Sequence, residues 1–358
     1  MSNFDITPPG DLIQFASDNV AGACPEAREA FLGAAGGFVT SYGADEVTRR
    51  ACAAMREVFA TDCEVFFVFN GTAANSLALA ALCQPYQSII CPDTAHIEVD
   101  ECGAPAFFAN GAKLICSRGS AGKLDVQGIE SILRKRQDIH HPQARAVSIS
   151  QSTELGTVYT AAEIAALGDC ARSNRLKFHM DGARFANAVA HLGVQPADIT
   201  WRAGVDVLCF GGAKMGMPLG EAVVFFDREL AADFAFRCKQ AGQLASKMRF
   251  LSAPWLAMLR DGTWLRHARH ANAMARRLAS ALATHPTLNV LYPVEANAVF
   301  VQLPDDAVAR LRAQGWQFLT SIGGGARFVC SWATTEAAVD RLAHAIVGSM
   351  HVRIVNFI

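Results

Sequence analysis

Seven short apolar segments recur through the first two thirds of this 358-residue chain, and alanine-rich helical stretches separate several of them. Short apolar runs bounded by turn-forming residues are typical of buried strands. Their alternation with helices predicts the α/β class, with a large domain built on a mainly parallel seven-stranded sheet covered by helices. The expected strands span residues 63–69, 88–91, 113–116, 144–150, 176–180, 205–210 and 222–226.

The pattern changes near residue 251. A long helix rich in Arg and Ala is expected over residues 255–284, and short strands are expected near 289–291, 298–302 and 327–330. This arrangement predicts a smaller C-terminal α/β domain. We therefore expect an N-terminal arm (1–15), a large domain (16–250) and a small domain (251–358).

Charge balance and cysteine content narrow the class of partner. Lys plus Arg (32) nearly equals Asp plus Glu (33), and no long run of like charge occurs, so we expect a small-molecule ligand and no nucleic acid. The polar start and the lack of an apolar run of about 18 residues predict neither a signal peptide nor a membrane partner. Eleven cysteines, none in a CxxC pair, favour a reducing, cytoplasmic location.

Open parallel sheets bind ligands beyond the carboxyl ends of their strands. There, the segment FVFNGTAANSLALAALC places Gly71, Thr72 and Ala73 between an expected strand and a helix. Gly71 allows close backbone approach, and the free N–H groups of a helix start suit a phosphate. The alternative is an ordinary turn capped by Asn70 or Thr72. The segment lacks the lysine of a P-loop and the three glycines of a dinucleotide fingerprint.

Asp181 follows the strand expected at 176–180, in the segment LKFHMDGARFAN, and Arg184 lies three residues further on. A carboxylate at this place could hold the N–H of a pyridinium ring and keep the ring cationic. The alternative is a residue that caps a helix or forms a turn.

Lys214 lies between glycine-containing turns in the segment VDVLCFGGAKMGMPLGEAVVFF. Partial desolvation would lower the pKa of its amine and favour a Schiff base, whereas the alternative is a surface lysine. Together with the Gly71 turn and Asp181, Lys214 completes a set that suits pyridoxal phosphate (PLP), each member just beyond a strand.

His96 follows the strand expected at 88–91, and Glu101 lies five residues later. An imidazole at this place could stack on a cofactor ring and act as a general base, directly or through water. The alternative is a histidine that begins a helix or packs in the core. The role of Glu101 stays open.

The chain resembles the threonine aldolases of low-specificity L-type, in the β-eliminating lyase group of PLP enzymes. The resemblance implies the aspartate-aminotransferase-like fold (fold type I) and runs from about residue 15 to residue 332. The motifs that carry it are, in chain order, SDN from Ser17, SYGAD around Tyr42, FNGTAAN, AHIEVDECG, QSTELGTVY, HMDGARFANA, FGGAKMG and RFVCSW.

The resemblance also implies how PLP is held. Gly71, Thr72 and Ala73 would bind its phosphate. His96 would stack on its ring, and Asp181 would pair with its pyridine nitrogen.

Further implied roles concern the reacting atoms. Lys214 would carry the cofactor as a Schiff base, and Ser17, Arg184 and Arg327 would gather around the substrate carboxylate. Guanidinium groups bind carboxylates in a bidentate manner, which agrees with this role. The catalytic set would be Lys214, His96 and Asp181.

The reaction implied is the cleavage of a β-hydroxy-α-amino acid, such as threonine, allo-threonine or phenylserine, to glycine and an aldehyde. The resemblance also implies a homo-oligomer, a dimer of dimers with the cofactor near a subunit interface. Many relatives carry a serine where Ala213 precedes Lys214, which leaves the preferred side chain open. Two alternatives are another fold-type-I enzyme (a β-lyase, racemase or aminotransferase) and a non-catalytic binding protein.

Two histidine pairs are candidates for metal ligands. His140 and His141 are adjacent, and the spacing of HARH places His267 and His270 on one helix face. Both pairs lie in charged stretches, so we expect them at the surface and expect no metal site.

Overall fold

A computed structural model describes residues 14–136 and 138–350 of the chain. The expected N-terminal arm therefore lies almost wholly outside the described residues. Among the described residues, no helix is both long enough and apolar enough to cross a membrane.

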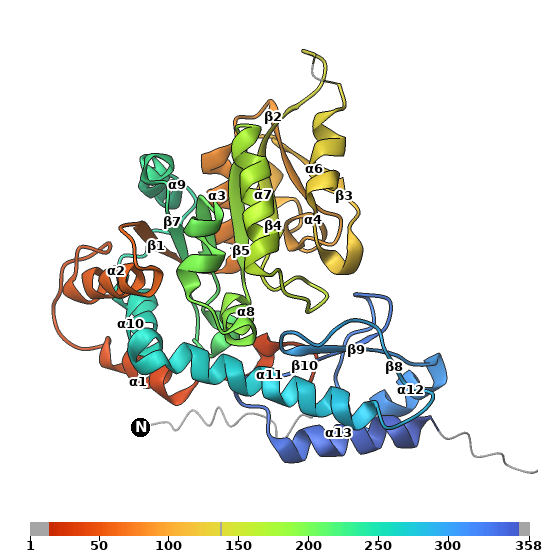
Figure 1. Ribbon diagram of the computed structural model, residues 1–358. Coiled ribbons are helices and arrows are strands. Elements are labelled where there is room, and N and C mark those ends of the chain that lie inside the picture. The colour runs from red at the N-terminus through yellow and green to blue at the C-terminus, as the bar shows by residue number, and fades with distance from the viewer. Residues whose placement is uncertain (1–13, 137, 351–358) are drawn as a thin grey trace, which may run out of the picture.

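A seven-stranded sheet forms the centre of the larger part of the molecule (Figure 1). All seven expected segments are strands, and the mainly parallel arrangement is confirmed because only β7 runs antiparallel to its neighbours β1 and β6. The spatial order is β1-β7-β6-β5-β4-β2-β3. The strands are β1 (Glu64–Val68), β2 (Gln87–Pro92), β3 (Lys113–Ser117), β4 (Gln143–Ser150), β5 (Lys177–Gly182), β6 (Val207–Phe210) and β7 (Glu221–Phe225).

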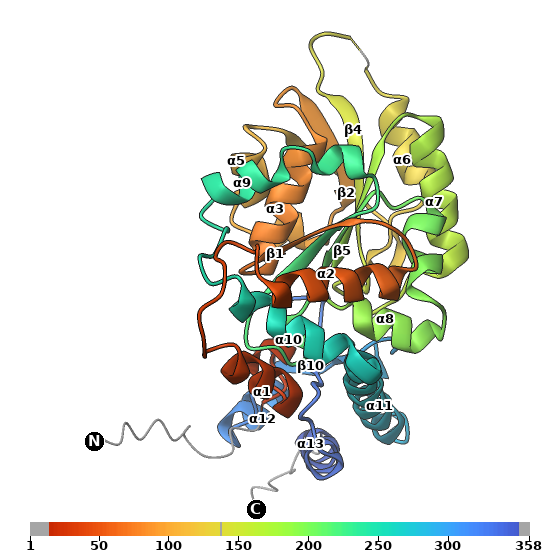
Figure 2. The same cartoon turned by 90° about the vertical axis from the view of Figure 1, so that its left-hand side faces the viewer.

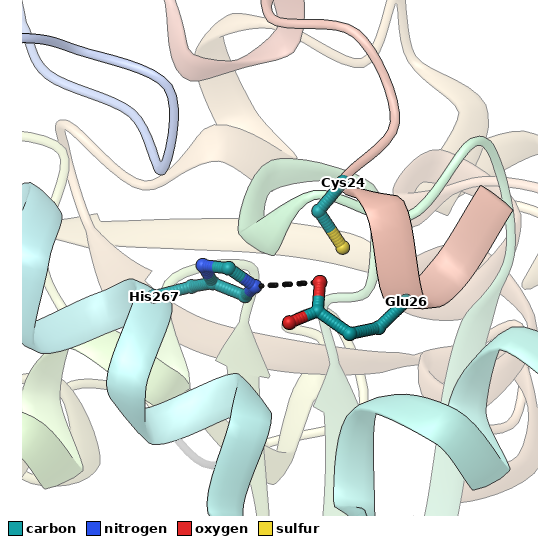
Figure 3. Close-up of side chains that lie close together, drawn as sticks. All are labelled: Cys24, Glu26 and His267. Atoms are coloured by element: carbon teal, nitrogen blue, oxygen red, sulfur yellow. Dashed lines mark hydrogen bonds and ion pairs between the residues drawn. The ribbon is translucent and has the colours of Figure 1, made fainter. Parts of the chain in front are cut away.

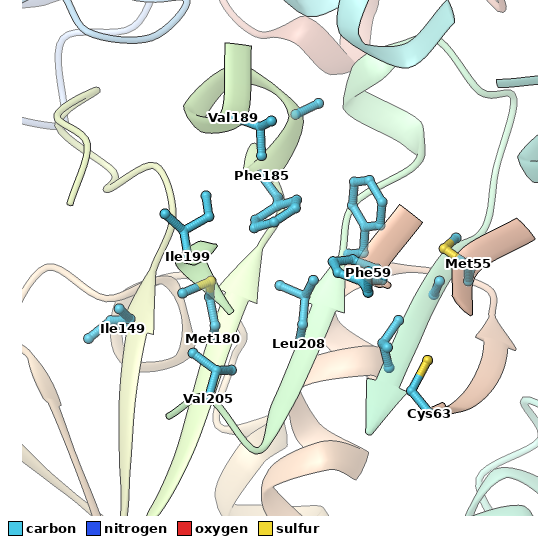
Figure 4. Close-up of a cluster of buried hydrophobic side chains, with 14 of the residues drawn as sticks. Met55, Phe59, Cys63, Ile149, Met180, Phe185, Val189, Ile199, Val205 and Leu208 are labelled. Atoms are coloured by element: carbon cyan, nitrogen blue, oxygen red, sulfur yellow. The ribbon is translucent and has the colours of Figure 1, made fainter. Parts of the chain in front are cut away.

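Helices cover both faces of this sheet (Figure 2). Those of the large sheet are α1 (Pro25–Gly33), α2 (Glu46–Phe59), α3 (Gly71–Leu82), α4 (His96–Val99), α5 (Ala104–Phe108), α6 (Val126–Leu133), α7 (Ala161–Ser173), α8 (Phe185–Leu192) and α9 (Phe234–Gln240). One face packs on α2, α7 and α8, and Figure 4 shows part of this core, including Phe59 and Leu208. The other face packs on α3 and α9.

Strand alternation decides which side chains point toward α3. Phe178 and Met180 of β5 belong to the core on the α2 and α8 side. Because successive side chains of a strand point to opposite faces, Asp181 points toward α3 instead. β6 behaves in the same way, since Leu208 joins the first core and Cys209 the second. The α3 face therefore carries the polar groups at the strand ends.

The three short segments expected in the C-terminal part are strands, and they form an antiparallel sheet. Its elements are β8 (Asn289–Val290), β9 (Ala298–Gln302), β10 (Ala326–Val329), α12 (Asp305–Ala313) and α13 (Glu336–Ser349). The boundary placed at residue 250 stays a prediction.

The prediction of a single helix over residues 255–284 is wrong. Two helices, α10 (Arg249–Leu259) and α11 (Thr263–Leu282), are separated by a short turn. In that turn Asp261 (φ 53°) and Gly262 (φ 65°) adopt left-handed backbone conformations. An α-helix cannot continue through such residues, so the chain changes direction.

Candidate active site

A cavity of about 220 Å³ opens at the ends of β5 and β6 and the start of α3. The structure brings five predicted residues to its wall, which are Gly71, Thr72, His96, Asp181 and Lys214. The other described residues that line it are Asn19, Asn70, Ala74, Asn75, Ala183, Cys209, Gly211, Ala213 and Glu221.

Lys214 lies in a one-turn 3-10 helix (Ala213–Met215) between β6 and β7. Two close backbone contacts explain the glycines before it: a Cβ on Gly211 would lie 2.5 Å from the Ala183 oxygen, and one on Gly212 would lie 2.3 Å from the Gly220 oxygen. Burial lowers the pKa of the Lys214 amine, and the Arg184 guanidinium lowers it further. Within the described residues this amine forms no hydrogen bond, so it is available to a ligand.

Asp181, 5% exposed, is held as a charged carboxylate. Burial raises its pKa, but the positive charges of His96 and Lys214, together with two hydrogen bonds, outweigh this, so the net direction is downward. Ala183 N–H donates to Oδ1 (2.9 Å), and Asn75 Nδ2 donates to Oδ2 (2.8 Å). These bonds fix the orientation of the carboxylate in the cavity.

His96 begins α4 and contacts Glu101, the residue whose role the sequence leaves open. His96 Nδ1 donates to Glu101 Oε1 at 2.8 Å, and Asn75 Nδ2 donates to the same oxygen at 2.8 Å. The hydrogen bond to Glu101 raises the pKa of His96. When Nδ1 carries the proton of a neutral ring, Nε2 is the nitrogen that can accept another, and the Asp100 carboxylate lies 3.6 Å from it.

The start of α3 leaves two donors unused. Asn70 caps the helix, and its Oδ1 accepts from Ala73 N–H at 2.9 Å. Of the three predicted phosphate ligands, Ala73 therefore has its N–H already paired. The N–H groups of Gly71 and Thr72 lie before the first intrahelical bond and have no partner among the described residues.

The predicted carboxylate-binding residues divide into two groups. Arg184 already forms a bidentate ion pair with the buried Asp18, with both N–O distances 2.8 Å. Ser17 caps the turn that begins at Asp18. Arg327 instead keeps a buried Nε without a partner, and burial, followed by Arg184, lowers the pKa of its guanidinium to about 10. Arg327 Nε is thus an unused donor, whereas Nε and Nη2 of Arg184 are engaged by Asp18.

Sequence reasoning missed four buried polar residues here. Asn75 lies one turn after Gly71 in α3, a spacing that places both on one helix face. Asp18 lies within the SDN motif, of which only Ser17 was assigned a role. Asn297 donates to Asp18 (2.9 Å) from a position 279 residues away, and no local signal could show this contact. Glu221 accepts a hydrogen bond from Gly212 N–H beside Lys214.

These observations fit PLP. The free Lys214 amine can bond the cofactor's aldehyde carbon, and the charged Asp181 is a partner for a pyridinium N–H. A Cβ on Gly71 would meet no atom within 4 Å, so the space beside the unpaired N–H groups is open for a phosphate.

The fold and this cavity define a PLP-dependent enzyme of fold type I. The chain belongs to the β-eliminating lyase family, because the family model described as "Beta-eliminating lyase" matches residues 14–306. The expected fold class, cofactor and family are thereby confirmed.

Individual relatives agree with this assignment. The chain is 58% identical over 331 residues to a low specificity L-threonine aldolase of a Pseudomonas strain, covering 92% of this chain and 96% of the relative. It is equally identical, over 334 residues, to the Pseudomonas aeruginosa protein of that name, covering 93% of this chain and 96% of the relative. The solved structure of Leishmania major threonine aldolase superposes with a TM-score of 0.88 at 26% identity, covering 94% of this chain and 99% of that one.

Proposed function

We propose that this chain cleaves a β-hydroxy-α-amino acid, threonine in the first instance, to glycine and an aldehyde. The observation that carries the proposal is the cavity in which the free Lys214 amine, the charged Asp181 and His96 meet. The similarity to two low specificity L-threonine aldolases favours this reaction over a β-lyase, racemase or aminotransferase.

The cofactor would be held at three points. The N–H groups of Gly71 and Thr72 would bind the phosphate, with Ala73 shaping the cradle through its backbone. Asp181 would accept the pyridinium N–H, and Lys214 would bond the cofactor covalently through Nζ. When bound, PLP supplies an electron sink for the bond that breaks at the substrate Cα.

The substrate carboxylate would be held by Arg327, whose buried Nε has no partner. Arg184 and Ser17 would complete this site, although the Arg184 fork is engaged by Asp18. Holding the carboxylate selects which bond of Cα stands perpendicular to the cofactor ring.

His96 would provide the proton acceptor. Glu101 fixes the proton of the ring on Nδ1, so Nε2 can accept the β-hydroxyl proton directly or through one water. The same ring would stack on the cofactor.

An absorbance spectrum with and without threonine, combined with acetaldehyde detection, tests the proposal. We expect visible absorbance from the bound cofactor, a spectral change on adding threonine or glycine, and one acetaldehyde per threonine consumed. A keto acid or a D-amino acid as the product would instead identify an aminotransferase or racemase. A coloured protein with no turnover would identify a binding protein.

We also propose a cytoplasmic homo-oligomer, a dimer of dimers. All eleven cysteines are free, which suits a reducing compartment. Phe38 (107% exposed) and Phe107 (77%) are the kind of large apolar side chains that subunit interfaces cover.

A further inference from the structure

A cluster of possible metal ligands lies outside the active-site cavity. Cys24 Sγ, a carboxylate oxygen of Glu26 and a ring nitrogen of His267 all lie within 4.8 Å of one another. Figure 3 shows the three side chains pointing toward one another from the start of α1 and from α11. The expectation that His267 lies at the surface is wrong, because its side chain is only 13% exposed.

Neighbouring contacts hold these groups in place. Cys24 N–H donates to the Gly216 oxygen at 2.8 Å, two residues beyond Lys214. Arg266 binds Glu26 Oε1 (2.7 Å), and Glu26 Oε2 lies 3.2 Å from His267 Nε2. The edge of the Trp332 ring packs on the His267 ring, with centroids 5.7 Å apart. The ligand set is therefore oriented before any ion arrives.

We propose that Cys24, Glu26 and His267 form a zinc-binding site. Thiolate, carboxylate and imidazole are the three ligand types that Zn²⁺ takes from proteins. In a tetrahedral site with bonds of about 2.0–2.3 Å, ligand atoms are roughly 3.3–3.8 Å apart. Glu26 Oε2 and His267 Nε2 lie 3.2 Å apart, and Cys24 Sγ lies within 4.8 Å of both ligands.

Charge and access also suit a divalent cation. Coordination replaces the Sγ–H proton of Cys24, which passes to solvent. The thiolate and the Glu26 carboxylate then supply two negative charges to the ion, and Arg266 remains bound to Oε1 of that carboxylate (2.7 Å). Glu26 is 33% exposed and gives the ion a path from water. On the inner side Cys24 Sγ contacts Met258 Sδ (3.4 Å), which keeps that side apolar. Three protein ligands leave the fourth position to water.

Bound zinc would connect α1 to α11 beneath the Lys214 turn. This role is independent of the proposed reaction, because none of the three ligands lines the active-site cavity. We therefore expect zinc to raise the melting temperature of the protein without being required for turnover.

Zinc titration of the full-length PLP-loaded protein, treated with a chelator and dialysed, tests the site. Competition with a chromogenic zinc chelator should show one ion per chain, and elemental analysis should give the same ratio. We expect Glu26→Gln, His267→Gln and Cys24→Ser each to weaken binding at least about tenfold. The matched controls Cys170→Ser and His191→Gln, which lie on α7 and α8, should bind as the parent does.

Circular dichroism separates loss of the site from loss of the fold. Glu26→Gln preserves the size of a partly exposed side chain, so we expect this variant to fold. If Cys24→Ser fails to fold, the zinc affinity of Glu26→Gln still tests the site. A parent protein that binds no zinc would overturn the proposal. So would undiminished binding by Glu26→Gln and His267→Gln, since the ion would then sit on other groups, such as the exposed Cys102 and Cys116.

Discussion

At the scale of single residues, the free amine of Lys214 is the feature on which the proposed chemistry depends. The Lys214→Ala variant removes the only atom proposed to bond PLP covalently, so the absorbance of the imine between protein and cofactor should disappear. Acetaldehyde release from threonine should fall by about a thousandfold or more. Lys113→Ala, at an exposed position of β3, should keep both signals. Normal turnover by Lys214→Ala would contradict the assignment.

Arg327 should contribute mainly to substrate binding. Loss of a charged hydrogen bond costs about 1.5–3 kcal/mol, so Arg327→Gln should lower kcat/KM about 10- to 150-fold. Most of this loss should appear as a higher KM for threonine. Arg312→Gln, at an exposed position, is the control. An unchanged KM in steady-state kinetics would place the carboxylate elsewhere.

Glu221 should make stability depend on pH. Burial raises the pKa of its carboxyl to about 7, above the value of about 4.3 for an unfolded chain. The folded state then binds the proton more tightly, so this contribution is complete below about pH 4.3 and is lost as pH rises through about 7.

Glu221→Gln removes that titration. Relative to the variant, the wild-type free energy of unfolding should therefore fall by roughly 3 kcal/mol between pH 4.5 and pH 8. The measurement is denaturant unfolding of both proteins across this range. Both proteins are cofactor-free, because the pKa given for Glu221 refers to a protein whose Lys214 amine carries no cofactor. Parallel curves would show that Glu221 does not titrate in this range.

At the scale of elements, a substitution at the start of α3 should change the affinity for PLP without changing the stability of the fold. A Cβ on Gly71 meets only open space, so Gly71→Val should leave the stability of the cofactor-free protein nearly unchanged. The added side chain would occupy the proposed phosphate cradle, and the Kd for PLP should rise at least about tenfold. Fluorescence titration with PLP checks this. Gly348→Val, also in open space, should bind PLP normally.

The strands were predictable from the sequence because buried strands consist of unbroken runs of apolar residues. All four residues of β6 are buried, for example, so no polar residue interrupts the pattern. The break between α10 and α11 was not predictable in this way. The break depends on the left-handed backbone conformations of Asp261 and Gly262. The sequence has helical periodicity on both sides of these residues, so the pattern does not indicate the break.

The candidate site likewise contains residues that the sequence could predict and residues that it could not. Lys214 and Gly71 each follow a strand and Asp181 lies at the carboxyl end of β5, so the sheet topology alone places them at one edge. Asp18 and Asn297 meet only because the C-terminal sheet packs beside the large one, which spacing in the sequence cannot show. Long-range polar contacts of this kind require the three-dimensional structure.

At the scale of the whole molecule, exposed apolar side chains gather at the end of α1 and in the connection between α1 and α2. Leu32 (63%), Phe38 (107%), Val39 (47%) and Tyr42 (50%) lie within eleven residues of one another in the sequence. Tyr42 N–H donates to the Ser246 oxygen at 3.0 Å, which joins this segment to the chain that follows α9. Exposed apolar side chains of this kind are what the proposed subunit interface would cover.

Phe38 therefore provides a test of the proposed oligomer. Burying a phenylalanine side chain contributes about 1.5–3 kcal/mol, and Asp at this position would add an unpaired charge to the interface. Sedimentation velocity should show the wild type as an oligomer and Phe38→Asp with a subunit dissociation constant at least about tenfold larger. Ile139→Asp is the control, because Ile139 is 96% exposed in the connection between α6 and β4. If Phe38→Asp assembles as the wild type does, the α1–α2 connection faces solvent, and the subunits must meet through another surface.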